Sequence, residues 1–184
     1  MTKKWLLFWG VLMLTPLMAS AQVAPAESGG GSNLSVALGA GFSGFDTDYA
    51  PDHMYGIAAY ADVDYGRWIG IEVEGRTIQW NQFYNLREDT IAAGGRVRLG
   101  HYGRFIPYAK FLGGVGSIDF PGFTFHLPSY THDTFAFYDA GGGLDYKLTQ
   151  HIYLRGDYEY EWWPRWPRHG LTPHGFTIGA NYRF

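Results

Sequence analysis

Residues 175–184 read Gly-Phe-Thr-Ile-Gly-Ala-Asn-Tyr-Arg-Phe, and this stretch decides the fold. Side chains alternate between the two faces of an extended strand, so one face here carries only apolar residues. These residues are Phe176, Ile178, Ala180, Tyr182 and Phe184. An exposed strand of this kind would recruit other chains, so both its face and its edge must be covered. A closed β-barrel in lipid covers both, because its last strand pairs with its first and its apolar face contacts acyl chains.

Seven segments upstream repeat the two-residue period and predict further strands. Their ranges are 34–42, 55–65, 68–78, 90–99, 106–117, 134–148 and 151–162. The connections alternate in length, with short ones near 66–67, 101–104 and 148–150 and long ones at 43–53, 79–89, 119–133 and 163–172. Short turns on one rim and long loops on the other are typical of membrane barrels whose short turns are periplasmic. The sequence therefore predicts an all-β fold, an eight-stranded antiparallel up-and-down transmembrane β-barrel.

The closing segment resembles the outer-membrane β-barrel family, in particular its OmpA-like eight-stranded transmembrane domains. The resemblance covers residues 34–184 and depends on the terminal phenylalanine with alternating apolar residues before it. It implies that Phe176, Ile178, Ala180, Tyr182 and Phe184 form the signal that the barrel-assembly machinery reads during insertion. It also implies outer-membrane lipid and lipopolysaccharide as partners, and we expect a monomer.

The first 21 residues predict a secretory signal peptide that is cleaved after Ala21. Lysines at positions 3 and 4 precede an apolar run at 5–14, and Ala19-Ser20-Ala21 fits a small-residue cleavage site. The alternative is a transmembrane helix, but the run is shorter than the roughly 20 residues that a span needs. Residues 22–33 then form a flexible periplasmic leader, and the barrel domain occupies residues 34–184. We therefore expect export and insertion into a bacterial outer membrane.

Composition narrows the function classes further. Without the two lysines of the signal peptide, 12 basic residues stand against 17 acidic ones, and no basic patch indicates a nucleic-acid partner. The chain has no cysteine, which excludes disulfides, thiolate metal sites and lipoprotein attachment. Aromatic residues make up 18% of the chain and glycine is abundant, which fits strands and turns better than helices.

The polar face of the strands gathers charges of both signs. An eight-stranded barrel has an interior that side chains just fill, so charges inside it must be paired. We predict an internal network in which Glu72, Glu74, Asp157, Glu159 and Glu161 face Arg76, Arg96, Arg98 and Arg155. Lys110, Tyr108, Gly114 and Lys147 are placed on the same face. Such a plug would block diffusion and argues against an open porin, while a narrow channel and a soluble barrel with an apolar lumen remain as alternatives.

Aromatic residues gather near the predicted strand ends, where girdles at the membrane interface are expected. Tyr65 and Trp68 lie toward the short turns, and Tyr158, Tyr160, Trp162, Trp163 and Trp166 lie toward the long loops. Tryptophan, proline and arginine alternate over residues 162–168. This stretch could grip lipopolysaccharide phosphates through Arg165 and Arg168, or it could be an interfacial anchor stiffened by prolines.

Possible catalytic residues are sparse. His126 and Ser129, with Asp119, His132 and Asp133 nearby, could support acyl transfer or deacylation of lipid A. The lipid A deacylase family places histidine and serine two residues apart and follows them with asparagine, whereas Pro128 intervenes here. Asp46, Asp48 and Asp52 in the first long loop could bind a divalent cation through their oxygens, but their spacing lacks the glycine and glutamate of a calcium loop. We therefore expect no enzyme, no metal and no cofactor, but a structural or cell-surface interaction role, with a lipid A-modifying enzyme as the alternative.

Overall fold

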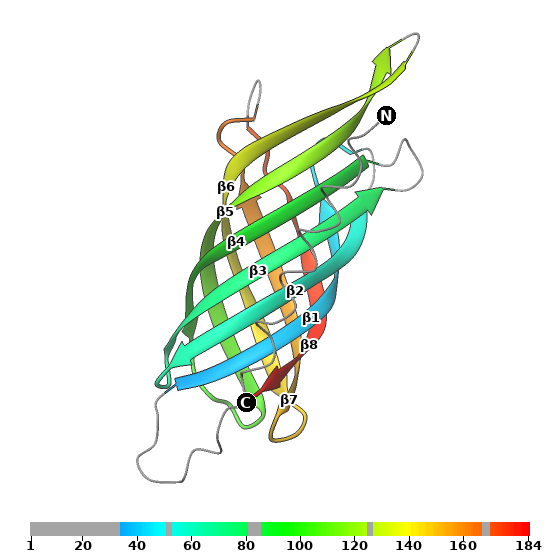
Figure 1. The fold of residues 1–184 in the computed structure, drawn as a ribbon. Coiled ribbons are helices and arrows are strands. Elements are labelled where there is room, and N and C mark those ends of the chain that lie inside the picture. Colours follow the sequence, from blue (N-terminus) through cyan, green and yellow to red (C-terminus); the bar gives the residue numbers. More distant parts are fainter. Residues whose placement is uncertain (1–33, 51–52, 81–85, 125–126, 167–169) are drawn as a thin grey trace, which may run out of the picture. The chain divides into compact units, whose positions relative to one another are not determined.

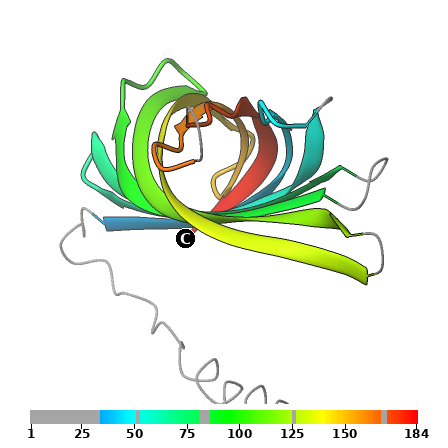
Figure 2. The same cartoon turned by 90° about the horizontal axis from the view of Figure 1, so that it is seen from above.

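The computed structural model describes residues 34–50, 53–80, 86–124, 127–166 and 170–184. It forms eight strands: β1 (Leu34–Asp46), β2 (Met54–Tyr65), β3 (Ile69–Trp80), β4 (Leu86–Arg98), β5 (Phe105–Thr124), β6 (Leu127–Lys147), β7 (Ile152–Trp162) and β8 (His174–Arg183). Each strand pairs antiparallel with the next, and β8 pairs with β1 to close the barrel (Figures 1 and 2). The predicted fold class is confirmed. Among the described residues, no helix is long and apolar enough to cross a membrane.

The closing strand β8 shows why the sequence adopts this fold. It pairs with β1 from Ala37 opposite Arg183 to Asp46 opposite His174, so its outer edge is satisfied by backbone hydrogen bonds. Its apolar residues point outward, and Ile178 is 71% exposed, whereas Thr177 is buried inside. The other strands alternate in the same way. Because the apolar face is on the outside, the alternative of a soluble barrel with an apolar lumen is wrong.

The largest difference between the predicted and the observed strands lies at β5 and β6. Residues 119–133 were expected to form a loop, but β5 continues to Thr124 and β6 begins at Leu127. Only the lower part of this hairpin belongs to the barrel wall, because β4 pairs with β5 as far as Asp119 and β7 pairs with β6 as far as Tyr138. The upper part projects beyond the rim as a two-stranded ribbon (Figure 1). Its aromatic and β-branched residues favour strands, and prolines are tolerated in edge strands.

The lengths of the connections distinguish the two rims of the barrel. The turns after β2, β4 and β6 are short, and Gly66 supplies the positive φ of 67° that the first of them needs. The C-terminus and the start of β1 lie at this same rim (Figure 1). The longer loops and the projecting hairpin lie at the opposite rim, where residues 163–173 join β7 to β8. This arrangement matches the expectation from the sequence that short turns lie on one rim and long loops on the other.

Candidate functional site

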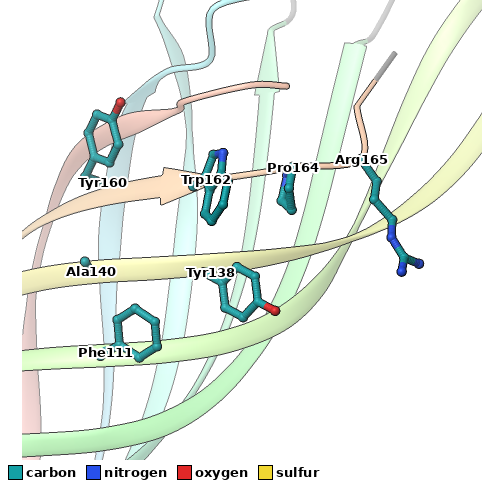
Figure 3. A pocket seen from close by; sticks show the side chains of 7 residues that line it. All are labelled: Phe111, Tyr138, Ala140, Tyr160, Trp162, Pro164 and Arg165. Carbon is teal, nitrogen blue, oxygen red and sulfur yellow. The ribbon is translucent and has the colours of Figure 1, made fainter. Parts of the chain in front are cut away.

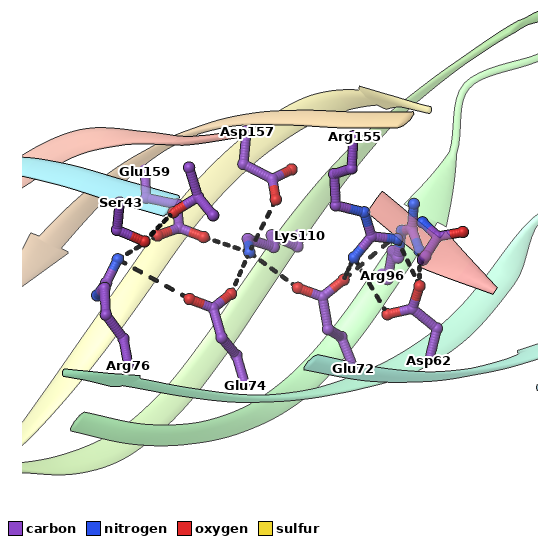
Figure 4. Close-up of polar contacts among 12 residues, drawn as sticks. Ser43, Asp62, Glu72, Glu74, Arg76, Arg96, Lys110, Arg155, Asp157 and Glu159 are labelled. Carbon is purple, nitrogen blue, oxygen red and sulfur yellow. Dashed lines mark hydrogen bonds and ion pairs between the residues drawn. The ribbon is translucent and has the colours of Figure 1, made fainter. Parts of the chain in front are cut away.

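Within the described residues, the barrel interior holds most of the charged side chains, and it is the candidate site. Ten carboxylates of this part of the chain are buried: Asp62, Asp64, Glu72, Glu74, Glu88, Asp139, Asp145, Asp157, Glu159 and Glu161. Five cations are buried with them: Arg76, Arg96, Arg98, Lys110 and Arg155. They come from six strands whose inward residues alternate with lipid-facing ones, so the two-residue period of the strands is what brings them together. Figure 4 shows the centre of the network.

Two arginines form the middle of the network. Arg155 Nε lies 2.9 Å from Asp145 Oδ1, its Nη1 lies 3.2 Å from Glu72 Oε2, and its guanidinium also pairs with Asp62. Arg96 pairs with Asp62 and Asp145 from the other side. The Arg96 guanidinium stacks 3.6 Å from the Tyr108 ring centroid. Shared carboxylates and ring faces therefore surround these two cations.

Lys110 and Arg76 form the next layer toward the long-loop rim. Lys110 Nζ lies 2.8 Å from Glu72 Oε1 and 2.7 Å from Glu74 Oε2, and it also contacts Glu159. Arg76 pairs with Glu159 and Glu161 and lies over the Phe45 ring, 3.7 Å from its centroid. Because Glu159 contacts both Lys110 and Arg76, and Glu72 contacts both Lys110 and Arg155, the layers are continuous.

A smaller group of charges lies at the short-turn end of the lumen. Arg98 pairs with Asp64, and Arg183 Nη2 lies 3.6 Å from the same carboxylate. Lys147, which the sequence pattern placed inside, is exposed because it stands at the end of β6 beside the turn. Glu88 was missed because residues 79–89 were expected to be loop, whereas β4 begins at Leu86 and turns Glu88 inward.

Asp157 differs from the other predicted members of the network. It was expected to face an arginine, but its closest cation is Lys110, 3.9 Å away. Neither carboxylate oxygen has a hydrogen-bond partner, although the residue is only 2% exposed. The reason is competition, because Lys110 already contacts three nearer carboxylates. Asp157 is therefore inside the cluster without being paired by it.

An apolar cluster caps the network toward the long-loop rim, and it corrects the prediction for Trp163. That side chain was expected at the membrane interface, but it is 0% exposed and lies inside the barrel. Its ring stacks on Phe137 at 5.0 Å, and its Nε1 donates to Glu161 Oε2 at 2.7 Å. A β-carbon at Gly116 would overlap the Trp163 ring, so this glycine makes room for the cap. The other members are Phe45, Met54, Ile78, Leu86, Ala92, Leu112, Ile118 and Leu171.

Trp166 is also corrected, because it is half-buried against the cap rather than turned to the interface. Its ring lies 6.0 Å from Tyr49 in a stacked arrangement and 5.0 Å from Phe135 edge-on. Tyr49 in the β1–β2 loop donates to Glu88 Oε2 at 2.5 Å. Burial and the Glu88 carboxylate raise the pKa of the Tyr49 phenol above its usual range, so the hydroxyl stays protonated and remains a donor. The loops are thereby tied to the barrel wall.

The remaining predicted interface aromatics point outward. Tyr65 and Trp68 are exposed at the short-turn rim, and Tyr158, Tyr160 and Trp162 are exposed on β7 toward the long-loop rim. The residues of the predicted assembly signal lie on the outer face of β8 and just after it, and Phe184 donates its backbone N–H to Val36 O at 3.0 Å. That bond places the terminal residue beside the first strand.

The residues proposed for catalysis and metal binding fall partly beyond what the structure describes. His126, Asp52 and Arg168 lie outside the described residues. Ser129 lies in β6, opposite Gly122, but its side chain is outside the described part. Asp48 Oδ2 accepts hydrogen bonds from Thr172 N at 2.8 Å and Thr172 Oγ1 at 2.6 Å, which joins the β1–β2 loop to the β7–β8 loop. No group of three potential metal ligands occurs within the described ranges.

Comparisons with known proteins agree with this geometry. The family described as outer membrane protein beta-barrel domain matches residues 10–184. Neisserial surface protein A matches with a TM-score of 0.60 at 15% identity, over 85% of this chain and 100% of that one. Ail of Yersinia pestis gives 0.56 at 16% identity, over 82% and 97%. OprG of Pseudomonas aeruginosa gives 0.59 at 13% identity, over 84% and 98%. No curated protein matches the sequence.

Proposed function

Because this chain belongs to the outer membrane protein β-barrel family, we propose that it is an integral outer-membrane protein with a closed interior and a structural or cell-surface interaction role. Export through a signal peptide cleaved after Ala21, and recognition of the β8 residues by the barrel-assembly machinery, belong to the same proposal. In it, the barrel holds the long-loop rim at the cell surface and does not conduct solutes.

One observation supports the proposal that the barrel interior is closed. The cross-section of the lumen is occupied by side chains that contact one another: Lys110 and Arg155 each contact three carboxylates, and they share Glu72. Trp163 covers this layer and is itself fully buried. A solute would have to separate buried ion pairs, which costs several kcal/mol for each charge left unpaired. That cost supports a barrel without a pore.

The interaction role is supported by what projects from the long-loop rim. The β5–β6 ribbon extends beyond the wall, and the β1–β2 and β7–β8 loops are joined through Asp48 and Thr172. Preorganised loops on a rigid barrel are a common place for binding surfaces. Ail, the attachment invasion locus protein, was solved in complex with the heparin analogue sucrose octasulfate; that structure matches this chain with a TM-score of 0.54 at 17% identity. We therefore favour a surface contact over catalysis.

Planar-bilayer recording tests the closed interior. We expect the mature chain, purified from outer membranes in detergent, to run with heat-dependent gel mobility and to insert without stepwise conductance. Steady unitary currents would contradict the proposal and favour the channel.

Incubation with lipid A followed by mass spectrometry tests the non-enzymatic role. We expect the lipid A mass to stay unchanged. Acyl loss or acyl addition that disappears in His126→Ala would establish the enzyme instead.

A further inference from the structure

The outer wall of the barrel has a groove at its long-loop end. It has a volume of about 640 Å³ and crosses the lipid-facing sides of β5, β6 and β7 (Figure 3). This volume lies within the roughly 300–1,000 Å³ that small-molecule sites occupy. The groove is separate from the interior network, because every strand residue that lines it alternates with an inward one.

Strand register explains why the wall is hollowed here. Ala140 lies directly between Phe111 and Tyr160 in one row across the three strands. In the next row toward the rim, Tyr138 lies between Gly113 and Trp162. A single methyl group therefore forms the floor, and large rings stand around it. The aromatic pair Tyr138 and Trp162, with centroids 6.0 Å apart, forms the upper wall.

A positive charge stands at the upper end of the groove. Pro164 and Arg165 follow β7 and line the groove beyond Trp162, to its right in Figure 3. Arg165 is exposed, and within the described ranges it has no ion-pair partner. The Tyr138 hydroxyl lies on the same side of the groove as the Arg165 guanidinium (Figure 3). An arginine fork and a phenol above an apolar slot suit a ligand with an anionic oxygen group joined to a hydrocarbon chain.

The position of the groove on the barrel wall indicates which ligand it binds. The groove opens on the face that contacts lipid, so its occupant comes from the membrane. It lies near the long-loop rim, which is the extracellular side in the proposed outer-membrane orientation. The phosphorylated lipid of that leaflet is lipopolysaccharide. We propose that the groove binds one lipopolysaccharide molecule, with an acyl chain across Ala140 and a lipid A phosphate at Arg165; this proposal depends on the proposed outer-membrane function.

Native mass spectrometry of the full mature chain in detergent, titrated with bisphosphorylated lipid A, tests the proposal. Arg165→Gln removes the phosphate contact, and Ala140→Trp fills the floor. We expect each variant to lower the bound fraction by about tenfold, equivalent to about 1.4 kcal/mol. Arg87→Gln is the matched charge control, because Arg87 is exposed near the same rim and pairs with Asp89. Ala59→Trp is the matched bulk control, because Ala59 faces outward on β2. Both controls should bind as the parent chain does.

Three outcomes would overturn the proposal. The first is unchanged lipid A binding by both groove variants, and the second is an equal loss in the controls. The third is dependence on the groove that is as strong for phosphatidylglycerol as for lipid A, since the site would then serve phospholipid in general. Heat-dependent gel mobility of the same samples reports the barrel itself. Normal mobility with failed lipid binding refutes the groove alone, whereas lost mobility in the parent chain refutes the proposed membrane function.

Discussion

Arg155→Met is the sharpest test of how the interior is stabilised. Arg155 is 2% exposed and touches Asp62, Glu72 and Asp145, and its guanidinium lies 4.2 Å from the Tyr60 ring centroid. Methionine keeps much of the side-chain volume but leaves these carboxylates without their central cation. Removing one partner of a buried ion pair costs about 3–5 kcal/mol. We expect the free energy of unfolding to fall by that amount.

Asp157→Asn is the matched control two residues along the same strand. Asp157 also points inward and is also 2% exposed, but neither of its oxygens has a hydrogen-bond partner. Replacing its carboxyl group with a neutral amide breaks no close ion pair. We therefore expect a change within about 0.5 kcal/mol, or a small gain. The two variants share place and burial and differ in whether the side chain is paired.

Urea unfolding of the barrel in phospholipid vesicles, followed by tryptophan fluorescence and gel mobility, measures the difference. With an m-value of about 2 kcal/mol per molar urea, a loss of 4 kcal/mol lowers the midpoint by about 2 M. Arg155→Lys keeps the charge but loses the planar fork, so its midpoint should fall between those of the parent and Arg155→Met. Equal midpoints for Arg155→Met and Asp157→Asn would refute the view that ion pairing, rather than volume or charge alone, stabilises the interior.

Three further outcomes follow from the fold. Trp163→Ala should cost about 3–5 kcal/mol in the same unfolding assay, because it empties the cap, whereas Trp162→Ala on the outer face should cost distinctly less; equal losses would contradict the burial of Trp163. Ile178→Arg should cost about 2–4 kcal/mol, because it places a cation near the middle of the lipid-facing wall, and an unchanged midpoint would mean that this face does not meet acyl chains. Intact-mass measurement of the exported protein should give a chain that begins at Gln22, and a mass that retains residues 1–21 would exclude cleavage.

The eight strands could be predicted from the sequence because each inward or outward choice is repeated many times. β8 and the terminal Phe184 carry five apolar residues on one face, and no charge interrupts them. β7 alternates Arg155, Asp157, Glu159 and Glu161 with apolar residues, so a shift of one position would put all four charges into lipid. A large and repeated penalty of this kind fixes the register without knowledge of the neighbours. The same penalty places the four charges of β7 in the lumen, whereas Lys147 and Glu88, near strand ends, were placed wrongly.

Individual side-chain contacts, which do not recur along the sequence, could not be predicted in this way. Trp163 was assigned to the interface because tryptophan is common there, although continuing the period of β7 by one residue turns it inward. What decides the matter is space, since Gly116 on β5 leaves room for the ring and Glu161 accepts its N–H. The ion-pair partners inside the network also depend on neighbours that the sequence pattern does not reveal. Sequence placed Asp157 in the lumen but could not show that Lys110 is already shared by nearer carboxylates.

The cap and the charged layer act as one seal because they share Glu161. One oxygen of this carboxylate pairs with Arg76 and the other accepts the Trp163 indole N–H. Loss of the indole would leave a buried acceptor on Glu161 unsatisfied, and loss of Arg76 would leave its buried charge unpaired. A substitution in either layer therefore also destabilises the other. The charged layer below Arg76 is still held by Lys110 and Arg155 when the cap is removed. A continuous pore therefore requires both layers to open, which is why a single substitution at Trp163 is expected to lower stability without producing conductance.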